Sequence, residues 1–454
     1  MQSINPVNGE VIHTYTEMPS VEAEHRIKQC HEAFLSWRKY SIEKRADRVH
    51  HAATLLKERK SRYARLMTEE MGKHLREAEA EIEKCAWVFE YYATHAVEFL
   101  SDTPVKTEMA ESFITYQPLG VVLAVMPWNF PFWQVFRFAA PALMAGNGAL
   151  LKHASNVCGC ALAIEEVFSD AGFPKALFST LLIPGKRVEE VITHPLVKAV
   201  TLTGSTEAGR SVAAMAGRCL KKSVLELGGS DPYLILEDAD LDKAVTACVK
   251  SRLINNGQSC IAAKRFIVVE AVYEAFVQAF TAQMEAIKMG DPTDNMADIG
   301  PQASLALRDA LHRQVTESVK AGARCLIGGH IPEEKGAWYP PTVLVDVQKG
   351  MPAYAEELFG PVAAIIRVKD TEEAIAVAND TAFGLGSGIF SEDIKNARRI
   401  ARDRIIAGAT AVNDFVKSDP RLPFGGVGES GYGRELSVFG IREFVNIKAV
   451  TVGA

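Results

Sequence analysis

Helical periodicity dominates the first hundred residues of the chain. Ile27, Cys30, Phe34 and Trp37 recur every three or four positions, and charged residues fill the intervals. This is the pattern of an amphipathic helix with one buried face. The stretch 69–90 continues in the same way, with many charged residues. We therefore expect long helices here that cover one side of a sheet.

Short apolar runs without alternation begin near residue 120, and each is followed by Gly or Pro and then by a helical stretch. Strands of this kind, separated by helices, are typical of a parallel sheet that is buried on both faces. In such a doubly wound α/β domain, ligands bind at the carboxyl ends of the strands. The runs are 121–126, 149–151, 200–202 and 224–227.

A second series of apolar runs follows a Gly-Gly pair at 228–229. Helical stretches separate its members, so we predict two Rossmann-like α/β halves with a seam at this pair. The runs are 233–236, 266–269, 363–367 and 411–412.

Two further segments, 113–117 and 445–452, alternate like exposed antiparallel strands. The second segment predicts an edge strand that needs a partner, for which another subunit is one candidate. The predicted fold class is thus α/β, with two Rossmann-like open-sheet domains and a small additional β element.

Composition narrows the class of protein. The 454 residues are 48% hydrophobic and 23% charged, as in ordinary soluble globular proteins, and the length favours two or more domains. The formal net charge of -6 indicates no basic face for a nucleic acid. No apolar run reaches the roughly 18–20 residues of a membrane span, and the first residues do not resemble a signal peptide. We expect a cytoplasmic protein without nucleic-acid or membrane partners.

Eight cysteines in a chain of this length do not suggest a disulfide framework. Cys158 and Cys160 form a C-x-C pair, but no second Cys or His pair lies at a ligand spacing, so we predict no metal site. Cys260 differs, because it follows a Gly-containing turn and precedes small residues. Backbone N–H groups at a helix start would depress its pKa and make it a nucleophile; a buried bystander is the alternative.

Two polar residues stand next to apolar runs. Glu226 interrupts an apolar strand just before the Gly-Gly pair, where burial would raise its pKa as a general base requires. Asn129 lies between two prolines, which restrict the backbone and would hold its amide as an oxyanion donor. The alternatives are a Glu whose carboxylate accepts hydrogen bonds from the flanking turn, and an Asn with a structural role in a proline-rich turn.

A weak phosphate-binding signal follows the third apolar run. The segment 202–209 predicts a strand, a Gly/Ser turn and a helix, whose free N–H groups can receive a pyrophosphate. It matches neither the G-x-G-x-x-G nor the P-loop pattern. Lys152 ends another strand at the edge where a ribose would lie.

Six motifs occur together and in order along essentially the whole chain. In this combination the chain resembles the aldehyde dehydrogenase superfamily, which implies an NAD(P)-dependent enzyme and disfavours the bystander interpretations of Cys260, Glu226 and Asn129. The motifs are Pro127-Trp-Asn-Phe-Pro131, Thr203-Gly-Ser205, Leu225-Glu-Leu-Gly-Gly229, Gly257-Gln-Ser-Cys260, Glu356-Glu-Leu-Phe-Gly-Pro361 and Pro423-Phe-Gly-Gly426.

The resemblance implies a role for each catalytic candidate. Cys260 matches the nucleophile that adds to the aldehyde carbon to form a thiohemiacetal, and Asn129 with the Cys260 N–H matches the oxyanion donors. Hydride transfer to the nicotinamide leaves a thioester, and Glu226 matches the base that activates water to hydrolyse it. The alternative from a different class is a binding or structural protein with the same fold and no catalytic activity. Such a protein would not need all three of Cys260, Asn129 and Glu226.

For the cofactor, one departure from the family is informative. NAD-preferring members often carry a Glu three residues after the lysine that Lys152 matches, and here that position is Ser155. A carboxylate would repel a 2′-phosphate, whereas serine accepts it and leaves Lys152 free to pair with it, so we predict NADP in preference to NAD. The implied cofactor-binding residues are Trp128, Lys152, Ser155, Gly204, Ser205, Glu357 and Phe359.

Three positions resemble those with which succinate semialdehyde dehydrogenases hold the distal carboxylate of their substrate. Arg137 lies six residues after the Pro-Trp-Asn-Phe-Pro motif, Arg265 five after the Gly-Gln-Ser-Cys motif, and Ser418 five before the Pro-Phe-Gly-Gly motif. Two guanidinium groups favour an anionic aldehyde, so the resemblance implies oxidation of succinate semialdehyde. The alternative substrates are glutarate semialdehyde or a broad range of aldehydes. The alternative role of the arginines is to form structural ion pairs.

The resemblance also divides the chain. It implies a discontinuous dinucleotide-binding domain at 1–106 and 119–228 and a catalytic domain at 229–436. Segments 107–118 and 437–454 resemble the strands through which family members form a homodimer or homotetramer.

Two departures concern proton transfer and subunit contacts. Phe138 stands where many members carry a lysine, so a proton relay through that lysine is not expected. The chain begins almost directly at Asn5, without the longer leader common in the family, so contacts made by that leader are not expected either.

Overall fold

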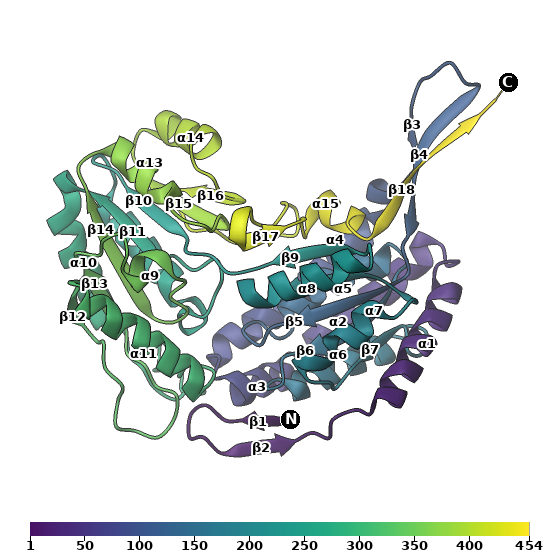
Figure 1. Ribbon diagram of the computed structural model, residues 1–454, viewed down its shortest axis with the longest axis horizontal. Helices are drawn as coiled ribbons and strands as arrows, with labels where there is room; N and C mark the ends of the chain where they lie inside the picture. Colours follow the sequence, from purple (N-terminus) through teal and green to yellow (C-terminus); the bar gives the residue numbers. More distant parts are fainter. Residues whose placement is uncertain (454) are drawn as a thin grey trace.

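Two α/β lobes and a projecting arm make up the computed structural model, which describes residues 1–453 (Figure 1). Each lobe is built on one mostly parallel sheet, and the chain passes from the first lobe to the second after residue 226. The predicted fold class is confirmed. No helix among residues 1–453 is both long and apolar enough to cross a membrane.

Six strands form the sheet of the first lobe. They are β5 (Val121–Met126), β6 (Gly148–His153), β7 (Phe178–Thr180), β8 (Val197–Thr203), β9 (Lys222–Glu226) and β17 (Gly431–Tyr432). Their order is β17-β9-β8-β5-β6-β7, and only β17 is antiparallel to its neighbour. The chain order reverses between β5 and β8, so the crevice for a ligand opens at the carboxyl ends of these two strands.

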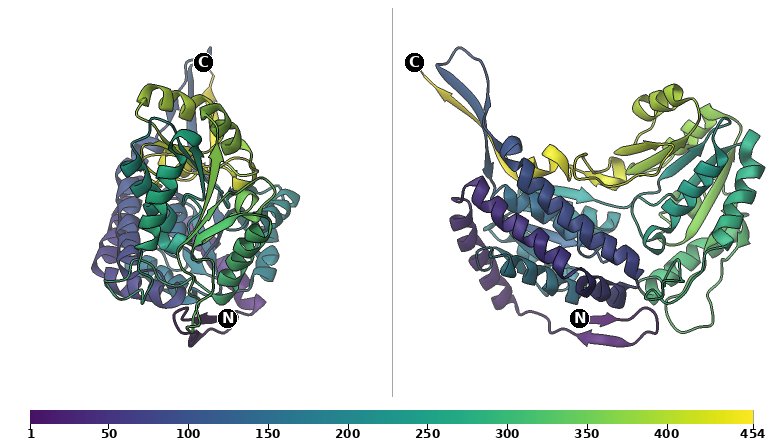
Figure 2. Two further views of the ribbon diagram at one scale, coloured as in Figure 1. Left: turned by 90° about the vertical axis from the view of Figure 1, so that its left-hand side faces the viewer. Right: turned by 180° about the vertical axis from the view of Figure 1, so that it is seen from behind.

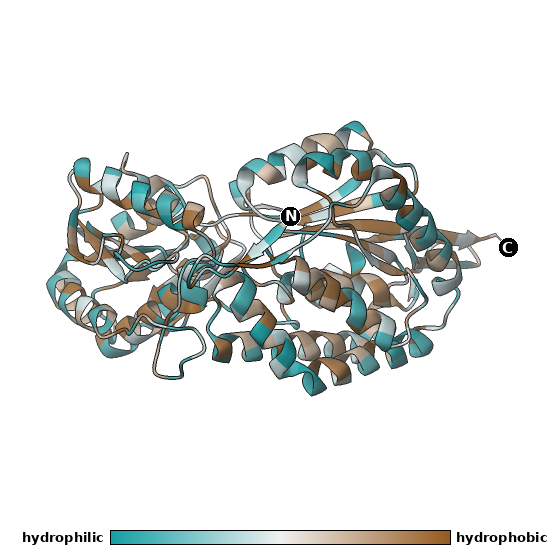
Figure 3. Ribbon diagram, turned by 90° about the horizontal axis from the view of Figure 1, so that it is seen from below, coloured by the Kyte–Doolittle hydropathy of each residue, from teal (hydrophilic) through white to brown (hydrophobic). Residues whose placement is uncertain are grey.

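Helices cover both faces of this sheet, which explains why its strands are apolar without alternation. The helices are α1 (Ser20–Trp37), α2 (Ile42–Glu58), α3 (Lys60–Met71), α4 (Leu75–Leu100), α5 (Trp133–Met144), α6 (Cys158–Asp170), α7 (Val188–Thr193) and α8 (Thr206–Arg218). One face packs against α1, α7 and α8, and the other against the layer from α2 to α6. Figure 3 shows apolar strands inside and polar helix faces outside.

The second lobe is built on a sheet of seven strands. They are β10 (Pro232–Ile235), β11 (Arg265–Val269), β12 (Arg324–Ile327), β13 (Thr342–Val345), β14 (Val362–Val368), β15 (Gly386–Phe390) and β16 (Ala409–Val412). Their order is β12-β13-β14-β11-β10-β15-β16, and only β12 runs antiparallel to its neighbour. The four predicted runs of this half are strands of the sheet.

The helices of the second lobe are α9 (Leu241–Leu253), α10 (Tyr273–Glu285), α11 (Leu305–Lys320), α12 (Pro352–Ala355), α13 (Thr371–Asn379) and α14 (Ile394–Asp403). One sheet face packs on α9 and α10, and the other on α11 to α14. Strand β15 carries two glycines and shows no apolar run. Gly388 is required because a Cβ there would lie 2.6 Å from the Tyr233 ring.

The arm consists of β18 (Val445–Val452), β4 (Glu111–Pro118) and β3 (Thr103–Pro104), and it projects away from both lobes (Figure 2). Strand β18 pairs with β4 along its whole length, so the tail strand finds its partner in its own chain. The outer edge of β18 has no strand beside it within residues 1–453.

The predicted domain boundaries need correction at both ends of the arm. Strand β3 pairs with β4 and so belongs to the arm rather than to the first lobe. Strand β17 pairs with β9, which returns this part of the predicted catalytic domain to the first sheet. Helix α15 (Ser437–Arg442) packs against α4 and α5 and is not part of the arm. Strand pairing and helix packing, which sequence motifs do not mark, decide these boundaries.

A buried carboxylate on α4 holds the start of α5. Both Phe132 N and Trp133 N donate to Glu81 Oε1 at 2.9 Å, which satisfies two N–H groups that a helix start leaves without partners. The other carboxylate oxygen of Glu81 pairs with the buried Lys73 ammonium. Since α5 carries Arg137, this contact positions part of the site described below.

We expect the Glu81→Ala variant to lower the free energy of unfolding by about 3–5 kcal/mol, because it leaves the Lys73 ammonium buried without a partner. Urea unfolding followed by circular dichroism measures the change. The matched control is Glu83→Ala on the same helix, whose exposed pair with Lys60 contributes less than about 1 kcal/mol. Equal losses in the two variants would contradict this account.

Candidate active site

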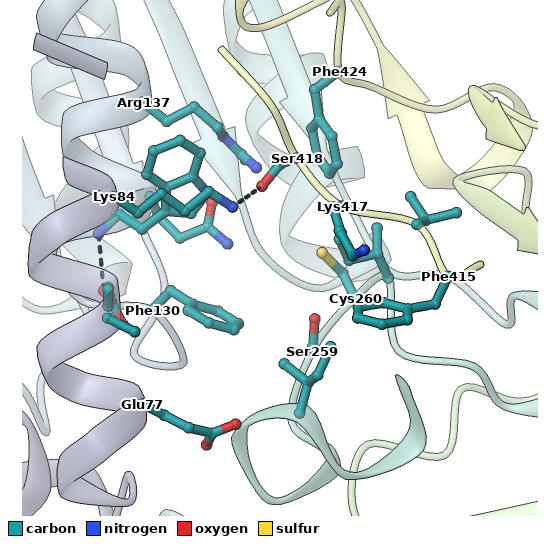
Figure 4. Close-up of a pocket in the computed structure, with 17 residues that line it drawn as sticks. Glu77, Lys84, Phe130, Arg137, Ser259, Cys260, Phe415, Lys417, Ser418 and Phe424 are labelled. Atoms are coloured by element: carbon teal, nitrogen blue, oxygen red, sulfur yellow. Dashed lines mark hydrogen bonds between the residues drawn. The ribbon is translucent and has the colours of Figure 1, made fainter. Parts of the chain in front are cut away.

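Cys260 borders two cavities that residues of both lobes line. One cavity, of about 260 Å³, opens at the carboxyl ends of β5 and β8 and is lined by residues that include Trp128, Asn129, Gly204, Ser205, Glu357 and Phe359. The other, of about 230 Å³, extends toward α4 and α5 (Figure 4). The half-buried Cys260 belongs to both cavities, so its sulfur can meet one molecule on each side.

The backbone before Cys260 makes a sharp left-handed turn. Asn255, Asn256 and Gly257 have φ values of 53°, 57° and 77°. A Cβ at Gly257 would lie 2.2 Å from the carbonyl carbon of Gly360, so only glycine fits there. The Gly-containing turn seen in the sequence therefore brings Cys260 close to the loop between α12 and β14.

Hydrogen bonds tie this turn to the loop after β5. Asn255 Nδ2 donates to the Asn129 carbonyl at 2.7 Å, and Asn129 Nδ2 donates to the Gln258 carbonyl at 3.0 Å. Lys264 Nζ donates to the Cys260 carbonyl at 2.7 Å. The Cys260 N–H donates to no group within residues 1–453, so it is free to bind an oxyanion.

The sulfur is not at a helix start, contrary to the sequence prediction. Cys260 precedes strand β11, and burial raises the pKa of its thiol to about 12. Arg137 and Lys264 act in the opposite direction but do not outweigh the burial. In the free protein the resting form at neutral pH is therefore the thiol.

Glu226 ends β9 with its carboxylate fully enclosed. Neither carboxylate oxygen has a hydrogen-bond partner within residues 1–453, and Glu226 lines neither cavity. Burial and the nearby Glu435 raise the pKa of Glu226 well above its ordinary value, and Arg137 opposes them. The predicted rise in the pKa of Glu226 is thus present. The carboxylate must turn toward Cys260 before it can act as a base next to the sulfur.

The cavity beyond β5 and β8 has the features of a dinucleotide site. Ser205 caps α8 by accepting a hydrogen bond from Ala208 N at 3.3 Å, and the start of this helix faces the cavity. The rings of Trp128 and Phe359 meet edge to face at 5.8 Å. The Glu357 carboxylate is anchored by Gly229 N at 3.1 Å and keeps one oxygen for a ligand hydroxyl.

Two predicted cofactor residues lie farther along the same edge. Lys152 is buried at the end of β6, where burial lowers its pKa, and it forms no ion pair within residues 1–453. Ser155 is exposed in the loop that follows. Neither lines the cavity next to Cys260, which fits contacts to the adenosine end of a cofactor.

The prediction that Arg265 binds substrate is wrong. Its side chain is fully buried in the second lobe and does not line the cavity. Its Nε donates to the Ser230 carbonyl at 3.0 Å, and the two terminal nitrogens donate to the Val377 and Ala378 carbonyls at 2.9 Å. The guanidinium holds α13 onto the sheet, a role close to the structural alternative.

Arg137 and Ser418 do line the cavity toward α4 and α5. The Arg137 guanidinium pairs with Glu435 and lies 4.6 Å from the centroid of the Phe424 ring. The Ser418 hydroxyl accepts a hydrogen bond from Lys84 Nζ at 2.6 Å. No sequence motif marks Lys84, because it is one of many charged residues in its helix.

The profile of the aldehyde dehydrogenase family matches residues 1–450. The chain belongs to the aldehyde dehydrogenase family. A probable succinate-semialdehyde dehydrogenase [NADP(+)] of Synechocystis sp. is 51% identical over 450 residues, which are 99% of each chain. A succinate-semialdehyde dehydrogenase [NADP(+)] of Mycolicibacterium paratuberculosis is 50% identical over 456 residues, with 100% of this chain and 96% of the relative covered.

A crystal structure of succinic semialdehyde dehydrogenase from Streptococcus pyogenes, in complex with NADP+, superposes with a TM-score of 0.98. It is 38% identical to this chain and covers 100% of both chains. The resemblance seen in the sequence is thereby confirmed at the level of the family and the fold.

This aldehyde dehydrogenase lacks a lysine after Arg137, and the structure shows what replaces it. Phe138 is buried and its ring meets that of Phe444 edge to face at 5.6 Å. Glu435, which no sequence motif marks, is the titratable neighbour that most raises the pKa of Glu226 after burial. The charged neighbours that shift the pKa of Glu226 most are therefore Glu435 and Arg137.

In the free aldehyde dehydrogenase, we expect iodoacetamide to modify Cys260 slowly at pH 7 and about tenfold faster for each pH unit up to pH 9. Only the thiolate reacts, and a thiol whose pKa is raised to about 12 gains thiolate throughout this range. Mass mapping of the peptide that contains Cys260 measures the rate. A rate that levels off below pH 9 would show that the pKa is not raised.

Proposed function

We propose that this aldehyde dehydrogenase oxidises succinate semialdehyde to succinate and prefers NADP to NAD. One observation carries the proposal: Cys260 lies between a cavity with dinucleotide-binding features and a cavity with cationic side chains. The names of relatives with about 50% identity support the same substrate and cofactor.

The cavity that extends from Cys260 toward α4 and α5, called the substrate-side cavity from here on, suits a short aldehyde with a distal carboxylate. Its volume of about 230 Å³ is below the roughly 300–1,000 Å³ of sites for drug-sized ligands. Phe130, Trp133 and Phe424 provide apolar walls for the carbon chain, and Arg137 with Ser418 provides polar donors. Charge-assisted hydrogen bonds to these donors favour an anionic substrate over a neutral one.

The first chemical step is the addition of the Cys260 thiolate to the aldehyde carbon. The oxygen becomes negative, and the free N–H of Cys260 and the second N–H of the Asn129 amide stabilise it. Because the resting thiol has a raised pKa, it must give its proton to a water molecule of the cavity as the sulfur attacks. The hydrogen bonds among Asn129, Asn255 and Gln258 fix the position of the Asn129 amide relative to the Cys260 sulfur.

When bound, NADP+ supplies the acceptor for the hydride that leaves the adduct. The thioester that remains on Cys260 is open to water, and we assign Glu226 as the base that takes the proton of this water. A raised pKa makes the carboxylate of Glu226 a stronger base once it is ionised. Cleavage of the C–S bond then releases the carboxylic acid, and the proton that Glu226 holds returns to the sulfur and restores the thiol.

The cofactor preference follows from Lys152 and Ser155. The buried ammonium of Lys152 has no carboxylate partner within residues 1–453, and the exposed Ser155 leaves space for a 2′-phosphate next to it. Trp128, Gly204, Ser205, Glu357 and Phe359 are the proposed contacts for the rest of the cofactor, with Ser205 near the pyrophosphate and Glu357 at the nicotinamide ribose.

We further propose a cytoplasmic homodimer or homotetramer that assembles through the arm. The unpaired edge of β18 exposes Ile447 and Val452, which a strand or sheet of a second subunit would cover. All eight cysteines are free thiols, as is usual in a reducing compartment.

The central test compares succinate semialdehyde with butanal, a neutral aldehyde of the same chain length, at saturating NADP. We expect kcat/KM to be at least about tenfold higher for succinate semialdehyde, because only this substrate gains charge-assisted hydrogen bonds. The Cys260→Ser variant should lose activity by at least about 10³-fold, whereas Cys325→Ser, an exposed control, should not. An equal or higher kcat/KM for butanal would refute the substrate assignment.

The cofactor preference predicts that Ser155→Glu lowers kcat/KM for NADP by roughly 10- to 100-fold and changes that for NAD much less. The added carboxylate repels the 2′-phosphate and pairs with Lys152 in its place. The Ser155→Ala control adds no charge and should keep most of the NADP activity. If Ser155→Glu affected both cofactors alike, Ser155 would not lie at the 2′-phosphate.

A further inference from the structure

The substrate-side cavity contains three cationic side chains, and two of them already have a carboxylate partner. Arg137 pairs with Glu435, and Lys417 at the exposed rim pairs with Asp414 at 2.7 Å. The third is Lys84, which forms no ion pair within residues 1–453.

The acidic residues of the same cavity do not neutralise Lys84 either. Glu81 pairs with Lys73 and accepts hydrogen bonds from the start of α5. Both carboxylate oxygens of Glu77 accept from Asn255 N at 3.1 Å. The positive charge of Lys84 is therefore the one that the folded chain leaves without a direct counter-charge in this cavity.

The surroundings of Lys84 are mostly apolar. Its Nζ lies 4.3 Å from the Trp133 ring centroid and donates one hydrogen bond, to Ser418 Oγ (Figure 4). An ammonium has three N–H donors, so two remain for a ligand. Because an ammonium in a partly apolar cavity is costly without an anion, this geometry favours the binding of a carboxylate.

We propose that Lys84 is the second cation that binds the distal carboxylate of the substrate, together with Arg137 and Ser418. In this arrangement Lys84 occupies the role that the sequence had assigned to Arg265. The Ser418 hydroxyl accepts from Lys84, so its own O–H points elsewhere and can donate to the same carboxylate. The inference rests on the proposed function, since it presupposes an anionic aldehyde in this cavity.

The charge of Lys84 depends on pH within an accessible range. Burial lowers its pKa to about 8, and Arg137 on α5 acts in the same direction. Cys85 and Glu81 on α4 and Asp419 in the loop after Ser418 oppose this shift. Since the cationic form binds the carboxylate, KM for succinate semialdehyde should rise as the pH increases through about 8, and KM for butanal should not.

The test is the Lys84→Met variant, which keeps the length of the side chain and removes its charge. We expect KM for succinate semialdehyde to rise by roughly 10- to 100-fold, as for the loss of a charge-assisted hydrogen bond, and kcat/KM for butanal to fall by a much smaller factor. The rise of KM above pH 8 should also disappear. Lys84→Arg, which keeps the charge, should recover most of the binding.

Lys60→Met is the matched control, because it removes a lysine outside the cavity whose charge Glu83 already neutralises. It should leave KM for both substrates within about twofold. Equal losses for succinate semialdehyde and butanal in Lys84→Met, or no change for either, would overturn the inference. Thermal melting of Lys84→Met shows whether an equal loss reflects misfolding, and Lys84→Arg then decides the question.

A second readout separates this inference from the proposed function. With butanal as substrate, succinate should inhibit the wild-type enzyme by binding to the carboxylate site. The same degree of inhibition of Lys84→Met should require a succinate concentration at least about tenfold higher. If the wild type does not prefer succinate semialdehyde but succinate inhibition still depends on Lys84, the substrate assignment fails and the carboxylate site stands. Unchanged inhibition in Lys84→Met would refute the site itself.

Discussion

The hydrogen bonds between the Cys260 loop and the loop after β5 are the constraint on which the site depends. Asn255 donates to the backbone of Asn129, and Asn129 donates to the backbone of Gln258, so a loop of each lobe holds the other. Cys260 and Asn129 both line the cavity at the carboxyl ends of β5 and β8, so this contact holds part of its wall in place. The left-handed turn at Gly257 makes the contact possible.

Several buried charges in the two lobes have a partner of opposite charge. Lys73 pairs with Glu81, Arg137 with Glu435 and Lys264 with Glu357, which offsets the cost of burying these charges. Two largely enclosed lysines, by contrast, have no carboxylate partner within residues 1–453. Lys152 lies at the edge of the first sheet and Lys84 in the substrate-side cavity, and the proposed ligand of each is an anion, the 2′-phosphate or the carboxylate.

Motif residues were predictable because their positions along the chain already specify local geometry. The apolar runs 121–126 and 200–202 predicted two strands with ligands at their carboxyl ends, and these are β5 and β8, which meet at the switch point of the sheet. Residues whose role depends on a distant partner were not predictable. Arg265 stands at a plausible spacing from Cys260, yet its guanidinium turns toward the carbonyl groups of Val377 and Ala378.

By itself the sequence determined the class of fold, the family and the set of motif residues around Cys260, since periodicity and local turns are properties of short segments. Only the tertiary structure decided that Cys260 lies before a strand with a raised pKa, that β17 returns to the first sheet, and that Lys84, and not Arg265, lies beside Ser418. The reason is physical: burial and charge pairing depend on residues hundreds of positions apart, such as Lys84 and Ser418, and only folding brings them together.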